Sequence, residues 1–271
     1  MLPFTLFNSS FLATQAFDPD PDAAAWFEAV EASGANFGPN ATIANANKMA
    51  WSNWVIAQKN AESPIPGKSN WDQLTQAGEG YIQPLMGVST FNVPALFGAS
   101  NFTNFVAGDH DPATGLRGGE DRAIYNGRTW DNTPLSNVSA GALMTGTPSE
   151  LLTSGRIVGD DALRDFIANN GTVRNRRGAS EDTTLLFSAS VPLTVAMNRF
   201  NVNGFQVINE GIYEFSVEAI THSPSPVAFL NDVELDRESD ARIGLAFYGR
   251  SIDIEAMNTA CVALSEAIVW P

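Results

Sequence analysis

The stretch SDARIGLAFYGRSIDIEAMNTACVALSEAI, residues 239–268, decides the fold. Its first half alternates as a β-strand does, with three apolar residues predicted to share one face of that strand: Ile243, Leu245 and Phe247. Farther along, apolar residues recur at intervals of three and four, the spacing of one helix face: Ile254, Met257, Cys261, Leu264 and Ile268. The stretch therefore predicts a strand followed by an amphipathic helix over residues 253–268.

The segment between strand and helix, SIDIE at residues 251–255, differs in one place from the Glu-x-Asp-x-Glu that laminarinase-type glucanases carry on a strand. Ser251 stands where the nucleophilic glutamate would be. Retaining glycosidases hold their two carboxyl groups about 5–5.5 Å apart, and a strand achieves this by alternation onto one face. Asp253 is instead suited to the N-cap of the helix, and Glu255 to its first turn. We interpret the segment as a helix cap without a catalytic function.

Composition limits the function classes open to this chain. The 271 residues carry 15 basic and 30 acidic side chains, which gives a formal net charge of −15. Such a charge repels phosphate backbones, so nucleic-acid binding is not expected. One cysteine, Cys261, and two histidines argue against a disulfide framework and against a cysteine- or histidine-rich metal site. We expect no metal, no cofactor, no signal peptide and no membrane span, and we expect Cys261 to be a core residue.

Residues 1–17 are predicted to form an apolar arm without helix caps. The side chains expected to make its contacts are Leu2, Phe4, Leu6, Phe7 and Phe11. By itself the arm has no surface to pack against, so two interpretations remain. It is either the first strand of the main domain or an arm that docks on a partner chain by strand addition. We favour the docking arm.

Residues 18–85 are predicted to be a small helical subdomain. Its first helix begins at the N-cap Asp20, a second helix spans about residues 41–58, and a short third helix spans about residues 71–81. From residue 86 to 271 the sequence pattern is typical of short β-strands with turns between them. The clearest hairpin alternates three apolar residues before an Asn-Gly turn: Leu193, Val195 and Met197, then Asn203 and Gly204.

Three segments, taken in order, match the pattern of a known domain. The final stretch fits the pattern aRI-x-FY-x-x-G-x-x-(I/L)-D before a helix. The residues that match are Arg242, Ile243, Phe247, Tyr248, Ile252 and Asp253, whereas the glycine comes early, at Gly249. Residues 20–34 match a helical leader, and Thr114–Gly118 match an opening strand in which Gly119 and Glu120 replace Asp-Gly. Together the segments resemble the concanavalin A-like (laminin-G-like) domain of bacteriophage tail fibres and spikes.

The resemblance implies a mainly β fold: a concanavalin A-like jelly-roll sandwich over residues 86–271, preceded by the helical subdomain and ending in the amphipathic helix. It also implies a virion protein made in the host cytoplasm, namely a fibre, spike or head-decoration subunit. Such a subunit would be a homo-oligomer, with a trimer favoured, and residues 1–17 would dock on other virion subunits. We expect it to contact host surface polysaccharide and not to be an enzyme. The alternatives are a glycan-cleaving enzyme on the same sandwich and a cement protein without a ligand.

A glycan site needs aromatic faces for the C–H surfaces of the sugar and planar polar groups for its hydroxyls. The segment NGRTWDN has this mixture near a predicted turn. The candidate carbohydrate-binding residues are Arg128, Trp130, Asp131 and Asn132. The other interpretation is a core tryptophan whose polar neighbours cap the loop.

Two charged segments are further candidates. Asp109-His110-Asp111 offers carboxylates to a hard cation such as Ca²⁺, but Ala113 and Gly115 follow instead of further ligands, so an Asx-type turn is preferred. The basic segment VRNRRG, residues 173–178, could bind an anionic sugar or form salt bridges to an acidic neighbouring subunit. We favour the salt bridges.

Overall fold

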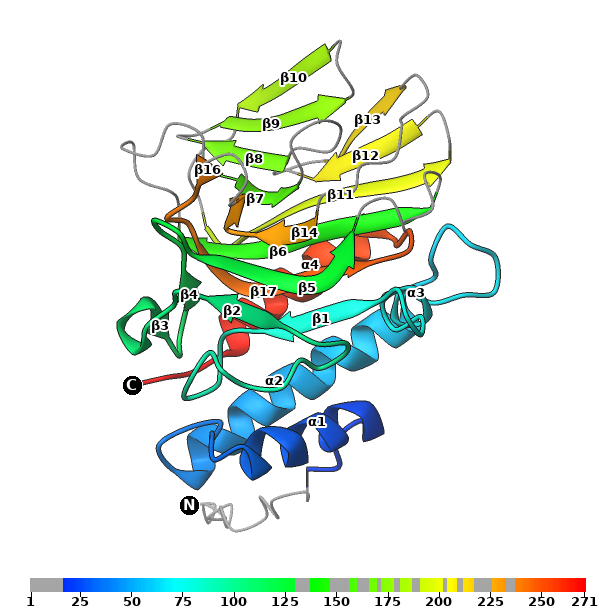
Figure 1. Ribbon diagram of the computed structural model, residues 1–271. Helices are drawn as coiled ribbons and strands as arrows, with labels where there is room; N and C mark the ends of the chain where they lie inside the picture. The colour runs from blue at the N-terminus through cyan, green and yellow to red at the C-terminus, as the bar shows by residue number, and fades with distance from the viewer. Residues whose placement is uncertain are drawn as a thin grey trace, which may run out of the picture.

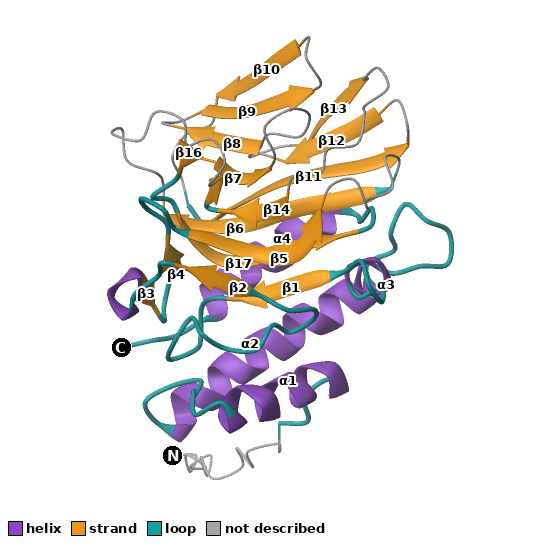
Figure 2. Ribbon diagram, in the orientation of Figure 1, coloured by secondary structure: helices purple, strands orange, loops and turns teal. Residues whose placement is uncertain are grey.

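Two antiparallel β-sheets pack face to face in this computed structural model, and helices lie against one of the sheets (Figure 1, Figure 2). The structure describes residues 17–129, 137–146, 191–201, 226–232 and 237–271, together with the strands between 156 and 186 and between 204 and 216. The arrangement confirms the mainly β, jelly-roll sandwich that the sequence predicts.

Within the described residues one sheet has eight strands and the other has seven. The helix-facing sheet has the order β13 (Ile212–Ser216), β12 (Gly204–Ile208), β11 (Leu193–Asn201), β6 (Val138–Gly146), β17 (Arg242–Gly249), β4 (Gly115–Arg117), β3 (His110–Asp111), with β1 (Tyr81–Pro84) also paired to β17. The outer sheet has the order β10 (Glu181–Leu186), β9 (Thr172–Arg177), β8 (Phe166–Asn169), β7 (Arg156–Gly159), β14 (Pro226–Phe229), β5 (Ala123–Thr129), β2 (Asn101–Thr103). A short separate pair is formed by β15 (Asn231–Asp232) and β16 (Arg237–Glu238).

The core between the sheets is built by alternate residues of the central strands. From β6 and β11 it receives Val138, Ala140, Ala142, Met144, Leu193, Val195 and Met197. From the outer sheet it receives Ile124, Val227 and Phe229. The alternation predicted for the first strand of the hairpin is thereby confirmed. Gly204 lies opposite Asn201 in the pairing of β11 with β12, so it begins the second strand.

β17 departs from simple alternation. Ile243 lies in the core between the sheets, whereas Leu245 and Phe247 lie in the core on the helix side. The register between β17 and β6 shifts on both sides of Ile243. A bulge of this kind adds a residue to one strand and reverses the faces beyond it. The prediction that these three residues share one face is therefore wrong.

The described part of the chain has four α-helices, and the N-caps predicted at Asp20 and Asp253 are confirmed. The helices are α1 (Pro21–Ala32), α2 (Ala41–Asn60), α3 (Asn70–Leu74) and α4 (Ile254–Ala267), with a 3₁₀ turn, η1 (Ala107–Asp109). The side chain of Asp20 caps α1, as predicted. α3 is shorter than predicted because the chain turns at Gly78, whose φ of 79° favours glycine, and then pairs with β17 as β1.

A second core lies between the helices and the helix-facing sheet. It is rich in aromatic residues, with edge-to-face contacts at centroid distances of 5.2 Å between Trp26 and Phe37 and 5.5 Å between Trp26 and Trp51. Cys261 is fully buried in it, as predicted. α1, α2 and α4 all contribute to this core together with the strands. The boundary that the sequence suggests at residue 85 stays a prediction.

Three buried asparagines hold the C-terminal segment through its backbone. The amide of Asn198 donates to the carbonyl of Ile252 at 2.8 Å and accepts from its N–H at 3.0 Å. Asn70 does the same at Asp253, at 2.9 and 2.7 Å. Asn47 pairs likewise with Val269, at 2.9 and 2.8 Å, and also donates to the carbonyl of Phe37 at 2.7 Å. These three asparagines, here called the asparagine clamps, fix α4 at both ends.

The SIDIE segment is a helix start, as predicted. Asp253 accepts from the N–H groups of Glu255 and Ala256 at 3.0 Å each, so it is the N-cap of α4. Ser251 is buried, and its hydroxyl donates to the carbonyl of Arg199. No strand aligns the carboxylates of this segment on one face, because α4 begins at Ile254.

Two of the segments that carry the resemblance lie side by side. β4 pairs with β17, and Leu116 is opposite Ile243. The glycines of the opening segment are required here: a Cβ on Gly115 would lie 2.1 Å from the carbonyl oxygen of Ile243, and one on Gly118 would lie 1.8 Å from that of Ser239. Gly115 also has a φ of 96°, which favours glycine.

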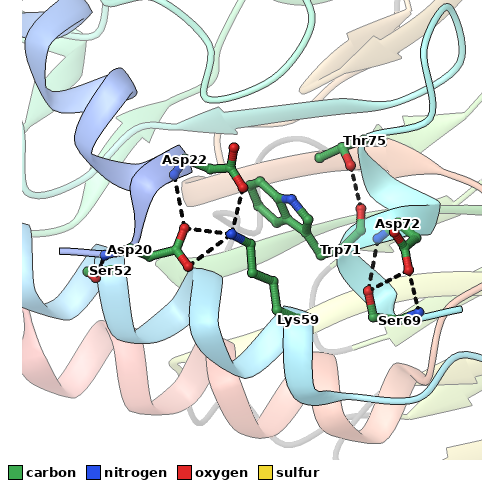
Figure 3. Close-up of polar contacts among 8 residues, drawn as sticks. All are labelled: Asp20, Asp22, Ser52, Lys59, Ser69, Trp71, Asp72 and Thr75. Atoms are coloured by element: carbon green, nitrogen blue, oxygen red, sulfur yellow. Dashed lines mark hydrogen bonds and ion pairs between the residues drawn. The ribbon is translucent and has the colours of Figure 1, made fainter.

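An ion pair fixes the start of α1 on α2 (Figure 3). The ammonium of Lys59 lies 2.7 Å from Asp20 and 2.6 Å from Asp22, and 5.5 Å from the ring centroid of Trp71. The N–H of Asp20 also donates to the hydroxyl of Ser52 at 2.8 Å. Burial lowers the pKa of Lys59, but the hydrogen bonds to the two aspartates outweigh it and hold the pKa above its ordinary value.

Replacing a clamp tests its contribution. We expect Asn47→Leu to lower the free energy of unfolding by about 2–3 kcal/mol, because the N–H and C=O groups that Asn47 pairs with lose their partners. Asn45→Leu, the same change two residues away at an exposed position of α2, is the control and should shift it by less than about 0.5 kcal/mol. Urea unfolding of both variants measures the difference. Equal values would show that the clamp contributes nothing.

Candidate functional site

The candidate site lies where the two sheets end on the same side. β2 is the last strand of the outer sheet and β3 the last of the helix-facing sheet. These two strands and the loops beside them gather a cluster of aromatic and apolar side chains, here called the edge patch: Phe91, Phe102, Phe105, Val106 and His110. The patch covers one open side of the sandwich.

The rings of the edge patch contact one another. The centroid of Phe91 lies 5.3 Å from that of Phe102, 5.8 Å from that of Phe105 and 6.3 Å from that of His110. The phenylalanines are half-buried and pack on the core between the sheets. Val106 is 58% exposed, the largest exposed fraction among the large apolar residues described. The patch thus presents apolar surface to solvent, and its phenylalanines pack on the core between the sheets.

Each phenylalanine of the edge patch has an asparagine beside it in the sequence. The pairs are Phe91 with Asn92, Phe102 with Asn101, and Phe105 with Asn104, and all three asparagines are exposed. Asn104 adopts a left-handed φ of 59°, and its amide donates to the carbonyl of Asp121 at 3.0 Å. That turn allows the chain to leave β2 and place Phe105 next to Phe91.

Charged groups adjoin the patch. Asp109 accepts from the N–H of Val106 at 2.8 Å and lies 3.1 Å from the guanidinium of Arg122. Arg242 donates to the carbonyl of Gly115 at 2.7 Å. Burial lowers the pKa of Arg242, and the charge of Asp111 opposes that effect. These contacts hold carboxylate and guanidinium groups at fixed positions beside the aromatic rings.

The Asp109–Asp111 segment forms a turn. Asp111 accepts from the N–H of Ala113 at 2.9 Å, the bond of an Asx turn, so the preferred interpretation is confirmed. Among the residues that the structure describes, no three His, Cys, Asp or Glu side chains are grouped as a metal site would need. Asp109 is committed instead to Arg122 and to the N–H of Val106.

His110 is mostly buried at the base of the patch. Its Nε2 lies 2.9 Å from the carbonyl oxygen of Leu85, a geometry in which Nε2–H donates. Burial lowers the pKa of His110 below its ordinary value, against the opposing effects of the hydrogen bond to Leu85 and the charge of Asp111. The neutral imidazole is therefore the form that the folded protein favours.

The residues predicted from the sequence lie elsewhere or outside the described part. Arg128 is near the end of β5, and its N–H donates to the side chain of Asn126 at 2.9 Å. Trp130, Asp131 and Asn132 lie outside the described residues, as do the arm residues Leu2, Phe4, Leu6, Phe7 and Phe11. The segment at 173–178 supplies strand β9, but its side chains are outside the description. The predicted carbohydrate-binding residues and the predicted docking residues of the arm therefore stay predictions.

Sequence reasoning missed the edge patch. The available signal was the repeated adjacency of phenylalanine and asparagine at 91–92, 101–102 and 104–105. Aromatic rings beside planar amides are the combination that suits sugar faces and hydroxyls. Two of the pairs are close in sequence, but only the pairing of strands brings Phe91 to them.

Comparisons with known proteins give structural similarity alone. No protein-family model and no curated protein matches the chain. Among solved structures, a mutant Trypanosoma rangeli sialidase with trans-sialidase activity aligns at a TM-score of 0.49 and 10% identity over 83% of this chain. The binding domain of Paraclostridial Mosquitocidal Protein 1 aligns at 0.43 and 10% over 67%. Botulinum neurotoxin type C, whose cell entry depends on interaction with two ganglioside molecules, aligns at 0.40 and 11% over 79%.

The chain spans 39% of the sialidase, 52% of the mosquitocidal binding domain and 53% of the neurotoxin chain. The expectation that the protein is not an enzyme is corrected by these comparisons. Sialidases are enzymes, and the same kind of fold also serves binding domains, so the fold does not place the chain outside the enzymes. In the described part, no helix has the length and apolar content that crossing a membrane requires.

The buried imidazole predicts a pH dependence of stability. Because the folded pKa of His110 lies below its unfolded value, the neutral form stabilises the fold at high pH, and this stabilisation is lost as the pH falls below about 6.5. We expect His110→Gln, whose amide can donate to Leu85, to lose less stability than the wild type between about pH 8 and about pH 5. Chemical unfolding of both proteins at the two pH values measures the difference. Parallel losses would contradict the assignment.

Proposed function

We propose that the chain is a glycan-binding β-sandwich that contacts host surface polysaccharide through the edge patch, as a subunit of a bacteriophage particle. The observation that carries the glycan part is the set of three adjacent phenylalanine–asparagine pairs on the open side of the sandwich. Their rings are fixed by mutual contact while their amides remain exposed.

The chemistry of the patch suits a saccharide. Aromatic rings and Val106 offer apolar surface to the C–H face of a sugar ring, and exposed amides offer both a donor and an acceptor to its hydroxyls. Asp111, which follows His110 in the chain, adds a carboxylate beside the patch, and Arg242, which donates to the carbonyl of Asp109 at 3.3 Å, adds a guanidinium. Because the Phe rings are held in place by the core beneath, little side-chain entropy is lost on binding.

The particle part rests on the sequence resemblance: a helical leader, the opening segment and the strand–helix ending in that order. In this proposal the subunit is a fibre, spike or head-decoration protein, is trimeric, and uses residues 1–17 to dock on other virion subunits. Mass spectrometry of purified particles tests it directly, and particles without copies of the chain would overturn it. Sedimentation of the purified protein tests the trimer.

A panel of host surface polysaccharides tests the glycan site. We expect Phe105→Ala to weaken binding of the best polysaccharide about tenfold, because a ring that contacts the sugar is lost. Asn101→Ala, which removes an exposed amide and leaves the core unchanged, should also weaken it. Ile56→Ala, which removes an exposed apolar side chain on α2, is the control and should bind as the wild type does.

Unchanged affinity of both patch variants would reject the edge patch as the site. The same panel is read for release of reducing ends and unsaturated products, so that binding followed by cleavage is distinguished from binding alone. Thermal unfolding of Phe105→Ala shows whether its fold is intact, and Asn101→Ala decides the result if it is not.

A further inference from the structure

The surface formed by α2, α4 and the residues after α4 has an unusual amount of exposed apolar side chain. Four large apolar residues are exposed in the described part of the chain, and three of them belong to this surface: Met49, Ile56 and Val269. Met49 and Ile56 are seven residues apart on α2, which places them on the same side of the helix. We call this surface the α2–α4 face.

A cavity of about 140 Å³ lies beside these residues. It is lined by Ala50, Asn53, Trp54, Ala57, Ala260, Ala263, Leu264 and Ala267, so it lies between α2 and α4. It reaches the surface at Asn53, Ala263 and Ala267, which are exposed. An apolar cavity of about 150 Å³ is large enough to take up benzene, so this space is the size of a phenyl side chain.

The α2 side of the α2–α4 face carries little unpaired charge in a protein with a net charge of −15, whereas α4 contributes the exposed Glu255 and Glu266. α2 has no acidic residue, and both of its lysines are engaged with α1: Lys48 lies 2.5 Å from Glu31, and Lys59 pairs with Asp20 and Asp22. The residues that line the cavity are all uncharged. An occupant of the cavity is therefore expected to be uncharged and apolar.

Residues 1–17 have that composition. They contain no Asp, Glu, Lys, Arg or His, although 17% of the whole chain is charged. The arm also ends in the right place. Phe17 packs on the helix-side core, and Asp20 is fixed on α2 by Ser52 and Lys59 (Figure 3). Ile56 is one turn from Ser52, so the arm joins the body at the border of the α2–α4 face.

We propose that, in the free subunit, residues 1–16 lie on the α2–α4 face of their own chain, with a phenylalanine of the arm in the cavity between α2 and α4. Sixteen residues reach up to about 50 Å when extended, whereas the face begins one helical turn from Ser52. The short link gives the arm a high effective concentration at this surface. Its apolar residues and the exposed Met49, Ile56 and Val269 then cover one another from water.

This proposal is independent of the glycan site, which is built from the loops at the sheet edges. It is also compatible with docking of the arm on another subunit, since the arm would leave its own face when the subunit joins an assembly. In either case the exposed apolar surface of arm and face is covered before assembly, which limits non-specific association of the free chain.

Thiol labelling of Asn53→Cys in the full chain tests the proposal. The native thiol does not interfere, because Cys261 is buried and burial raises its pKa to about 11. Two proteins that both contain Asn53→Cys are compared: one has the native arm, and the other has an arm with Phe4→Ser, Phe7→Ser and Phe11→Ser. We expect the thiol to be labelled about tenfold more slowly in the protein with the native arm. Phe7→Ser alone should remove part of the protection, and it decides the result if the triple variant fails to fold.

Glu28→Cys on the exposed side of α1 is the matched control and should react at the same rate with either arm. The rates are measured over about a tenfold range of protein concentration, because an arm of the same chain protects equally at every concentration. Equal labelling of Asn53→Cys with the native and altered arms overturns the proposal. Protection that disappears on dilution also overturns it, since the occupant would then be a second copy.

Discussion

The structure depends on the asparagine clamps. In each clamp the side-chain amide donates to the C=O and accepts from the N–H of one residue, as a neighbouring β-strand would. Asn70 and Asn198 bind in this way the segment that leads into α4, and Asn47 binds the segment that follows α4. All three side chains are fully buried, so replacing one of them removes the partners of a backbone N–H and a backbone C=O at once. Because the clamps come from α2, from the start of α3 and from β11, they join the helices and the helix-facing sheet to the end of the chain.

That attachment determines which surfaces are available for function. α4 packs on one face of the helix-facing sheet, α2 packs on α4 and α1 on α2, and the outer sheet covers the other face (Figure 2). The sandwich is left open where β2 and β3 end, and there the loops place the aromatic rings and exposed amides of the edge patch. The helix side has a different character: the cavity between α2 and α4 is lined by uncharged residues, most of them alanine, and residues 1–17 join the body beside α2.

Local patterns predicted individual elements well. The caps at Asp20 and Asp253, the face of α4 with Cys261 buried, and the alternation of Leu193, Val195 and Met197 all follow from neighbours a few residues apart. Predictions failed where pairing with a distant strand decided the outcome. The bulge beside Ile243 turned Leu245 and Phe247 to the other face. The third helix ends at Leu74, and Tyr81, the last residue predicted for that helix, pairs with β17 as the first residue of β1.

The sequence by itself therefore determined the class of the fold, its helix starts and the nature of the SIDIE segment, because periodicity and capping are properties of short segments. It did not locate the edge patch. Phe91 meets Phe102 and Phe105 only after β2 has paired with β5 and the loop at Asn104 has turned back. Contacts of this kind join residues that the chain brings together only when both sheets are complete, so the tertiary structure alone decided where a ligand-binding surface could form.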